Sequence, residues 1–170
     1  MTVQIRRLKQ SDLPSLEWDG EYVHFRRLYQ DIYSNSRSGN SILWVADLSG
    51  KGIIGQLFVQ LKGTRMELAD GKNRAYIFAF RVRNPYRCQG IGSLLLNRAE
   101  IDLVKRDFNF ITLNVAQDNN EARNFYENRG YKVVSVEAGR WYYIDHLGRK
   151  QEVNEPSWRM IKMIKRAFDG

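Results

Sequence analysis

Hydrophobic and polar residues recur along this chain with two periods, and each period predicts one type of secondary structure. Alternation at every second residue, or a short run of β-branched and aromatic residues, predicts a strand. Strands are therefore expected over residues 3–7, 42–46, 53–61, 75–82, 110–115, 131–136 and 158–164. The last segment is ambiguous, because Arg159, Lys162 and Lys165 are spaced by three, as on a helix. We predict a strand there, since the segment is short and mostly apolar, like a buried strand.

Apolar positions at helical spacing predict four helices. These are a short helix entering at residues 13–14 and longer helices over residues 22–33, 93–106 and 119–128. Ser11 or Asp12 can cap the first helix, Asn119 can cap the last, and Gly130 is a natural helix terminator. Residues 48–52 and 146–149 have the composition of turns. No internal repeat or linker marks a boundary, so one domain over residues 1–170 is expected.

Length and composition limit the class of protein. A chain of 170 residues that is 43% hydrophobic can form one sizeable core and is not disordered. No stretch approaches the ~20 apolar residues of a membrane span, and the amino terminus lacks a signal-peptide pattern. The sequence therefore predicts a cytoplasmic protein that does not associate with membranes.

Charge and metal-binding residues exclude further classes. The formal net charge is +8, but the basic residues are scattered, which is more typical of a solvated surface than of a nucleic-acid footprint. Nucleic acid is therefore a disfavoured partner. One cysteine, Cys88, and two distant histidines, His24 and His146, make no recognisable zinc pattern. No metal site is expected.

The most informative segment is the glycine-rich turn that follows the strand at residues 75–82. Gly90 and Gly92 flank Ile91 where an amphipathic helix begins. Unpaired amides and the helix dipole favour an anion at such a position, and Arg87 can add a fixed charge. The pattern also fits a turn chosen only for its backbone geometry. A Walker A motif would need Gly-Lys-Ser/Thr, and a dinucleotide fingerprint would need a glycine where Leu95 stands.

This turn resembles the cofactor loop of the GNAT-type N-acetyltransferases, which has the form (R/Q)xxGx(G/A). The match is complete at Arg87, Cys88, Gln89, Gly90, Ile91 and Gly92. A second element of that family is an Asn-x-x-Ala-x-x-x-Tyr helix followed by a glycine and an aromatic residue. It matches at Asn119, Ala122, Tyr126, Gly130 and Tyr131. The two motifs have the expected order and separation, and residues 74–136 carry nearly all of the resemblance.

The resemblance implies a fold and an activity. The fold would be of the α/β (α+β) class, with a mixed, mostly antiparallel central sheet of about seven strands and helices on both faces. The activity would be acetyl transfer from acetyl-CoA to a primary amine, by direct attack in a ternary complex. The acceptor would be a small-molecule amine or a protein or peptide amine.

The resemblance also implies roles for individual residues. Loop amides would bind the coenzyme A pyrophosphate, and the loop residues are Arg87, Cys88, Gln89, Gly90, Ile91, Gly92 and Ser93. The strand residues Phe80, Arg81 and Val82 would pair with the pantetheine arm, with the Val82 amide stabilising the carbonyl oxygen. Asn114 and Asn119 would lie along the pantetheine. Tyr126 would face the sulfur and hydrogen-bond the departing thiolate.

Several of these residues also have purely structural explanations. Tyr126 fits a core aromatic position, Asn119 a helix cap, and Asn114 a partner for a backbone group at a strand end. Cys88 has no histidine near it in sequence, which favours an incidental cysteine over a nucleophile. The strand at residues 75–82 also lacks the carboxylate that many relatives use as a base.

The acceptor site and the base are less defined. Glu21, Glu67, Asp70 and Asp118 are available carboxylates, and none is assigned as the base. The acceptor would lie between residues 18–33 and 140–156. Both regions are rich in aromatic residues, which suits an apolar or cationic acceptor but also a core or a homodimer contact. A non-catalytic acyl-CoA sensor and, less favoured, a basic nucleic-acid binder are the alternative functions.

Overall fold

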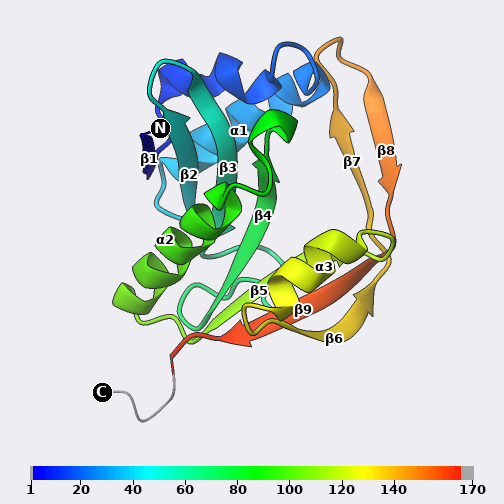
Figure 1. Cartoon of the computed structure of the whole chain (residues 1–170). Helices are drawn as coiled ribbons and strands as arrows, with labels where there is room; N and C mark the ends of the chain where they lie inside the picture. The colour runs from blue at the N-terminus through cyan, green and yellow to red at the C-terminus, as the bar shows by residue number, and fades with distance from the viewer. Residues whose placement is uncertain (1, 166–170) are drawn as a thin grey trace.

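The central feature is a seven-stranded sheet with the order β1-β2-β3-β4-β5-β9-β6 (Figure 1). The computed structural model describes residues 2–165. Its sheet strands are β1 (Val3–Arg7), β2 (Ser41–Leu48), β3 (Gly52–Gln60), β4 (Arg74–Val82), β5 (Phe110–Ala116), β6 (Lys132–Glu137) and β9 (Ser157–Met163). Neighbouring strands are antiparallel except for β4 and β5, which are parallel. The predicted mixed, mostly antiparallel sheet is confirmed, and the ambiguous last segment is a strand.

Helices cover both faces of this sheet, as the fold prediction requires. The helices are α1 (Arg26–Ser36), α2 (Ile91–Lys105) and α3 (Asn120–Glu127), with 3₁₀ segments η1 (Gln10–Glu17), η2 (Val23–Phe25) and η3 (Asn84–Tyr86). The N-cap residue of η1 is Lys9, so the helix begins earlier than predicted and neither Ser11 nor Asp12 is its cap. Asp12 lies in the first turn, where its carboxylate accepts a hydrogen bond from the Lys9 amide at 2.7 Å. The Asn119 side-chain oxygen accepts from the Ala122 amide at 3.1 Å, which confirms the predicted cap of α3.

The hydrophobic pattern of the central strands explains the two layers. On β2, Trp44 and Ala46 belong to the core under α2 and α3, whereas Leu43 and Val45 belong to the core under η1 and α1. Successive side chains of a strand point to opposite faces, so a strand buried on both faces is apolar throughout. This is why β2 and β3 read as continuous apolar runs and lie at the centre of the sheet.

Strands β4 and β5 separate part of the way along their length. Their pairing joins Arg74–Ile77 of β4 to Phe110–Leu113 of β5 and goes no further. Beyond it, Ala79 has a φ of +49°, and the register with β3 shifts, which marks a β-bulge. The buried Gln56 side chain donates to the Ala79 carbonyl at 3.1 Å and supports the bulge. The bend leaves the second half of β4 without a partner on its β5 side.

A second, two-stranded sheet stands apart from the central one. It consists of β7 (Arg140–Ile144) and β8 (Lys150–Asn154), and in Figure 1 it extends beyond the sheet toward η2. The Asp145 carboxylate accepts from the amides of Leu147 and Arg149, both at 2.9 Å, which builds the predicted turn at residues 146–149. Among the helices of residues 2–165, none has the length and apolar character needed to cross a bilayer.

Candidate active site

The predicted cofactor loop presents a run of free backbone amides. Within residues 2–165, the amides of residues 88–93 have no hydrogen-bond acceptor, and α2 has no side-chain cap. Cys88 has a φ of +60° and Gly90 a φ of +84°, so right- and left-handed conformations alternate through the turn. Such alternation turns successive N–H groups toward one point, and together with a helix N-terminus it forms an anion site.

Side chains frame this loop instead of filling it. Arg87 donates from Nε to the Val82 carbonyl at 2.9 Å, and Gln89 donates to the Pro85 carbonyl at 3.0 Å. Residues 87–90 are exposed. Arg129, at the end of α3, donates to the Ser93 hydroxyl and stacks 3.8 Å from the Phe125 ring centre. Arg129 was not among the predicted site residues, because its only signal in the sequence is its place beside Gly130.

An aromatic cluster joins the loop to β4 and α3. The Phe80 ring lies 6.1 Å from Phe125 and 6.2 Å from Tyr126, measured between ring centres. A Cβ atom on Gly92 would lie 3.5 Å from the Phe125 ring and 3.7 Å from the Phe80 ring. The glycine therefore allows α2 to begin directly against these rings, which brings the loop, β4 and Tyr126 together.

The Tyr126 phenol is buried and stays protonated. Only 9% of the residue is exposed, and its hydroxyl has no hydrogen-bond partner in the part of the chain that the structure describes. Burial, followed by the nearby Tyr76, raises the pKa of Tyr126 well above its usual range. A phenol in this state can donate a hydrogen bond and resists ionisation.

The amide of Val82 points toward the gap between β4 and β5. The Arg83 amide donates a hydrogen bond to the Ile54 carbonyl at 2.9 Å, so these two residues are a hydrogen-bonded pair. Val82 and Gly55 are the next pair along the strands. Hydrogen-bonded and non-hydrogen-bonded pairs alternate along antiparallel strands. The Val82 amide therefore faces away from β3, toward the gap.

Tyr76 and Asn114 face each other just beside the gap. The Asn114 Nδ2 atom donates to the Tyr76 hydroxyl at 3.4 Å, and its Oδ1 atom is buried without a partner among the described residues. Burial raises the pKa of Tyr76, and the neighbouring Arg65 partly opposes that shift. Tyr76 was not among the predicted site residues, because no motif marks it; only the parallel pairing of β4 with β5 places it beside Asn114.

A pocket of about 680 Å³ opens beside these two residues. Its walls come from α1, β4, β5 and the segments that connect the hairpin to the sheet. Its lining includes Phe25, Tyr29, Tyr76, Arg81, Asn114, Glu137, Arg140, Trp141 and Glu155. Phe25 of η2 and Tyr29 of α1 form an aromatic wall on one side, whereas the sheet and the hairpin connections contribute both aromatic and charged residues.

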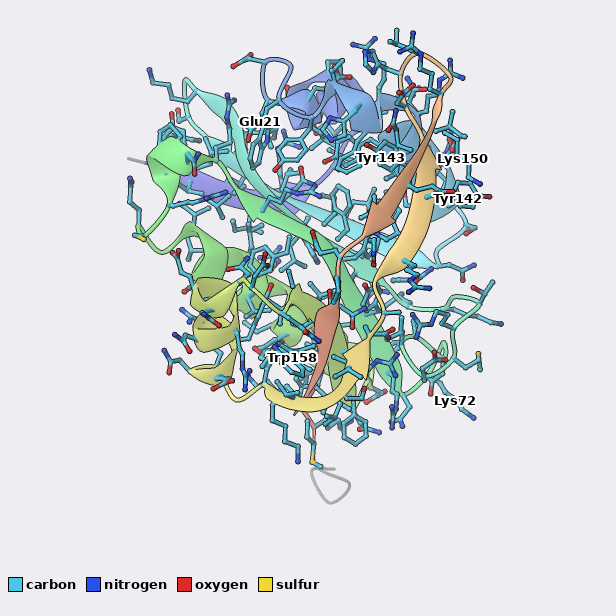
Figure 2. All side chains as sticks on the ribbon, turned by 90° about the vertical axis from the view of Figure 1, so that its right-hand side faces the viewer. Glu21, Lys72, Tyr142, Tyr143, Lys150 and Trp158 are labelled. Atoms are coloured by element: carbon cyan, nitrogen blue, oxygen red, sulfur yellow. The ribbon has the colours of Figure 1, made fainter. Side chains whose placement is uncertain are left out.

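The two aromatic regions predicted to hold the acceptor lie against each other. The Tyr143 ring of β7 is 4.9 Å from Phe25, and the Trp141 ring is 6.3 Å from Phe25. Figure 2 shows the hairpin with Tyr142 and Tyr143 labelled. Tyr143 is half-buried, whereas Tyr142 is 62% exposed. Alternate residues of β7 therefore face α1 and solvent.

None of the four carboxylates considered as a base lines this pocket. Glu21 and Asp118 are exposed, Glu67 pairs with Arg65, and Asp70 accepts from the amides of residues 72–74. The carboxylates that line the pocket are Glu137 and Glu155. Glu137 forms ion pairs with Arg65, at 2.8 Å, and with Arg159. Its charge is thus neutralised.

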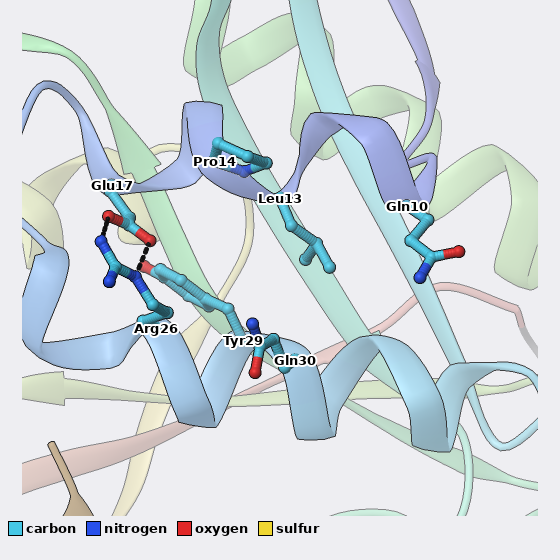
Figure 3. A pocket seen from close by; sticks show the side chains of 7 residues that line it. All are labelled: Gln10, Leu13, Pro14, Glu17, Arg26, Tyr29 and Gln30. Carbon is cyan, nitrogen blue, oxygen red and sulfur yellow. Dashed lines mark hydrogen bonds and ion pairs between the residues drawn. The ribbon is translucent and has the colours of Figure 1, made fainter. Parts of the chain in front are cut away.

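A smaller surface pocket of about 380 Å³ lies between η1 and α1 (Figure 3). Its charged residues, Glu17 and Arg26, form a two-pronged ion pair with both distances at 2.9 Å. Tyr29 contributes to both pockets. Because its charges cancel, this smaller pocket offers no free charge to a ligand.

The sequence matches the acetyltransferase (GNAT) family over residues 4–131. The chain belongs to this family. As a member, it is an N-acetyltransferase that uses acetyl-CoA as its co-substrate. The predicted family, enzyme class and co-substrate are confirmed.

Individual relatives agree with this assignment. N-alpha-acetyltransferase 50 of Danio rerio is 28% identical over 125 residues, which are 71% of this chain and 74% of that protein. N-alpha-acetyltransferase 60 of Danio rerio is 33% identical over 118 residues, 61% of this chain and 47% of that protein, so the match spans about half of that relative. The structure of Arabidopsis thaliana NAA60 in complex with acetyl-CoA superposes with a TM-score of 0.70 at 20% identity, covering 96% of this chain and 99% of that one. This likeness concerns the fold.

Proposed function

We propose that this acetyltransferase transfers the acetyl group directly to a primary amine within a ternary complex. The observation that carries the proposal is the run of free amides at residues 88–93, beside the gap between β4 and β5 and the buried Tyr126. The two curated relatives are named as N-alpha-acetyltransferases. By that likeness, we assign a peptide α-amino group as the acceptor.

Acetyl-CoA would bind along the gap. The loop amides would hold its pyrophosphate, with Arg87 and Arg129 adding positive charge. The backbone of Phe80–Val82 would pair with the pantetheine arm in place of a neighbouring strand. Asn114, whose Oδ1 atom is unpaired in the described residues, would accept a hydrogen bond from a pantetheine amide, and Asn119 would lie nearby.

The amine would attack the thioester carbonyl carbon, forming the new carbon–nitrogen bond as the carbon–sulfur bond breaks. The proton that the nitrogen loses would pass to a water molecule. Negative charge develops first on the carbonyl oxygen, where the Val82 amide would donate a hydrogen bond; removing one such donor costs ~3 kcal/mol in other enzymes. The charge then passes to the sulfur. Since the pKa of Tyr126 is raised, this residue would stabilise the thiolate as a hydrogen-bond donor.

The acceptor would approach through the larger pocket. Tyr76 lies at the gap and lines the pocket, so its hydroxyl would accept a hydrogen bond from the incoming amine. The pocket wall includes residues beyond position 131, where the match to the family ends. We therefore propose that residues 1–170 form one acetyltransferase domain, with the hairpin as part of its acceptor site.

Replacing Tyr126 by phenylalanine tests the proposed role of the phenol. In Tyr126→Phe, kcat should fall about a hundredfold, because the thiolate loses its donor, while the Kd for acetyl-CoA by calorimetry should stay close to wild type. Tyr131→Phe is the matched control, since Tyr131 is also a buried tyrosine and lies 5.7 Å from Tyr126 between ring centres. An unchanged kcat in Tyr126→Phe would remove this residue from the mechanism, and failure of the wild-type protein to bind acetyl-CoA would overturn the proposed function.

A further inference from the structure

Arg81 occupies an unusual position in the acceptor pocket. On β4 its neighbours Phe80 and Val82 pack against the core under α2 and α3. The Arg81 side chain leaves the opposite face of the strand, where its guanidinium lies 4.6 Å from the Tyr22 ring centre and 5.3 Å from that of Phe25. It thus forms part of the aromatic wall of the pocket.

The positive charge of Arg81 has no acidic partner. Its Nη1 atom donates to the Tyr29 hydroxyl at 2.9 Å, and no carboxylate within the described part of the chain lies within 4.0 Å of it. Two other arginines nearby are neutralised: Arg83 pairs with Asp19 at 2.9 Å, and Arg159 pairs with Glu137. A guanidinium has five N–H donors, so Arg81 retains donors for a further acceptor.

The surroundings hold the guanidinium in place without cancelling its charge. Two aromatic faces and a phenol oxygen fix its orientation, which lowers the entropy lost when a ligand binds. Burial is the main cause that lowers the pKa of His24, and the positive charge of Arg81 lowers it further. Glu155 and Arg140 line the hairpin side of the pocket and are exposed. Arg81 therefore places a positive charge against the aromatic wall of Phe25 and Tyr29.

We propose that Arg81 recognises an anionic group, a carboxylate or a phosphate, that the acceptor carries close to its amine. This inference rests on the proposed function. A planar guanidinium binds a carboxylate or phosphate through two parallel hydrogen bonds. Arg81 directly precedes Val82, whose amide faces the gap, so the anion and the reacting amine belong to the same small region. The same charge disfavours acceptors with a second ammonium, such as polyamines or lysine-rich peptides.

Three pairs of acceptors distinguish the sources of the anion. The first pair is two peptides that differ only in an aspartate or an asparagine at the second position, and the second pair is two peptides that differ only in a phosphoserine or a serine there. The third pair is a free α-amino acid and its amide. For wild-type protein, kcat/KM should be at least about tenfold higher for the anionic member of one pair, which is the gain expected of a charged hydrogen bond. The pair that shows the preference identifies the source.

Substitutions at Arg81 then assign the preference to this residue. Arg81→Gln should raise KM for the anionic acceptor by about ten- to a hundredfold more than it raises KM for the neutral acceptor. Arg81→Lys, which keeps the charge but loses the planar fork, should give an intermediate KM. Arg98→Gln is the control, because Arg98 also stacks on an aromatic ring, 5.1 Å from the Trp44 centre, but lies on α2. It should keep the wild-type preference.

Two results would overturn the inference: equal kcat/KM within all three pairs, or a preference that survives in Arg81→Gln. A drop in kcat that is equal for charged and neutral acceptors would assign Arg81 a structural role instead. Acetyl-CoA binding and turnover of any amine are measured in the same samples. If both are present while the preference is absent, only this inference fails; if both are absent, the proposed function fails.

Discussion

The two halves of the active site are built in different ways. The half proposed to bind acetyl-CoA uses backbone amides from one continuous stretch, residues 88–93, and a short helix with its own motif. The half proposed to bind the acceptor uses side chains from α1, β4, β5 and the hairpin connections, which are far apart in the sequence. The first half depends on local backbone conformation, and the second depends on how distant segments pack.

Electrostatics differ between the halves in the same way. On the coenzyme side, positive potential comes from the N-terminus of α2 and from exposed arginines such as Arg87. On the acceptor side, Arg65 and Glu137 are paired with each other, whereas the guanidinium of Arg81 is held by contacts with Tyr22, Phe25 and Tyr29. Substitutions should therefore separate acceptor binding from acetyl-CoA binding.

Gly139→Ala should give the largest difference between the effect on acceptor use and the effect on acetyl-CoA binding. Gly139 has a φ of +68°, and a Cβ atom there would lie 1.7 Å from the Glu155 backbone oxygen, so the base of the hairpin must move. Displacing a positioning wall by about 1 Å can cost about a hundredfold in rate. Steady-state kinetics should show kcat/KM for the acceptor falling by about that factor, whereas calorimetry should show nearly normal acetyl-CoA binding.

Gly148→Ala provides the control for the hairpin. Gly148 also has a positive φ, +82°, but a Cβ atom there would meet only the end of the Arg27 side chain at 3.5 Å. This variant should keep most of the acceptor kcat/KM. Equal losses in the two variants would mean that strain in the hairpin, and not the position of its base, controls acceptor binding.

Gly90→Ala should give a smaller difference in the opposite direction, with acetyl-CoA binding weakened more than acceptor use. Gly90 has a φ of +84°, and the left-handed conformation costs a residue with a Cβ atom about 1 kcal/mol. Relief of that strain would turn the loop amides, so the Kd for acetyl-CoA should rise about tenfold, with little change in acceptor KM. Calorimetry measures the first quantity and kinetics the second.

Gly50→Ala separates this effect from general destabilisation. Gly50 lies in the turn between β2 and β3 and has a φ of +77°; as at Gly90, an added Cβ atom would have no neighbour within 4 Å. Both variants should lose similar unfolding free energy. The idea that loop amides bind the pyrophosphate fails if Gly50→Ala weakens acetyl-CoA binding as much as Gly90→Ala does.

The smallest effect concerns a property that the two halves share. Burial raises the pKa of Tyr29 and Tyr76, which line the acceptor pocket, and of Tyr126 and Tyr131, which lie in the core under α2 and α3. Above the unfolded pKa of about 10, the unfolded chain loses phenolic protons that the folded chain keeps. The contribution of these buried phenols to the free energy of unfolding is therefore fully present below about pH 10. Above that pH the free energy of unfolding falls, by up to about 1.4 kcal/mol per pH unit for each tyrosine.

Urea unfolding at a series of alkaline pH values measures how steeply the free energy of unfolding falls with pH. Tyr131→Phe should make this slope shallower, because one buried phenol no longer contributes. Tyr142→Phe, at a residue that is 62% exposed, should leave the slope as it is. If both substitutions change the slope equally, burial is not the cause of the alkaline loss.

The sequence by itself determined the parts of this protein whose signals are local. Strand and helix periods predicted the seven strands of the central sheet, including β9, and the helices α1, α2 and α3, but not β7 and β8. Asn119 could be identified as a cap because a cap acts within three residues. The cofactor loop was identified for the same reason, since its chemistry lies in consecutive amides of residues 88–93.

Only the tertiary structure decided which side chains meet across the sheet. The partial pairing of β4 with β5 places Tyr76 beside Asn114, and the packing of the hairpin on Phe25 closes the pocket. Folding also places Arg129 at the start of α2 and leaves Arg81 without a carboxylate in the described residues. These outcomes depend on contacts between segments tens of residues apart, which no local period or motif encodes.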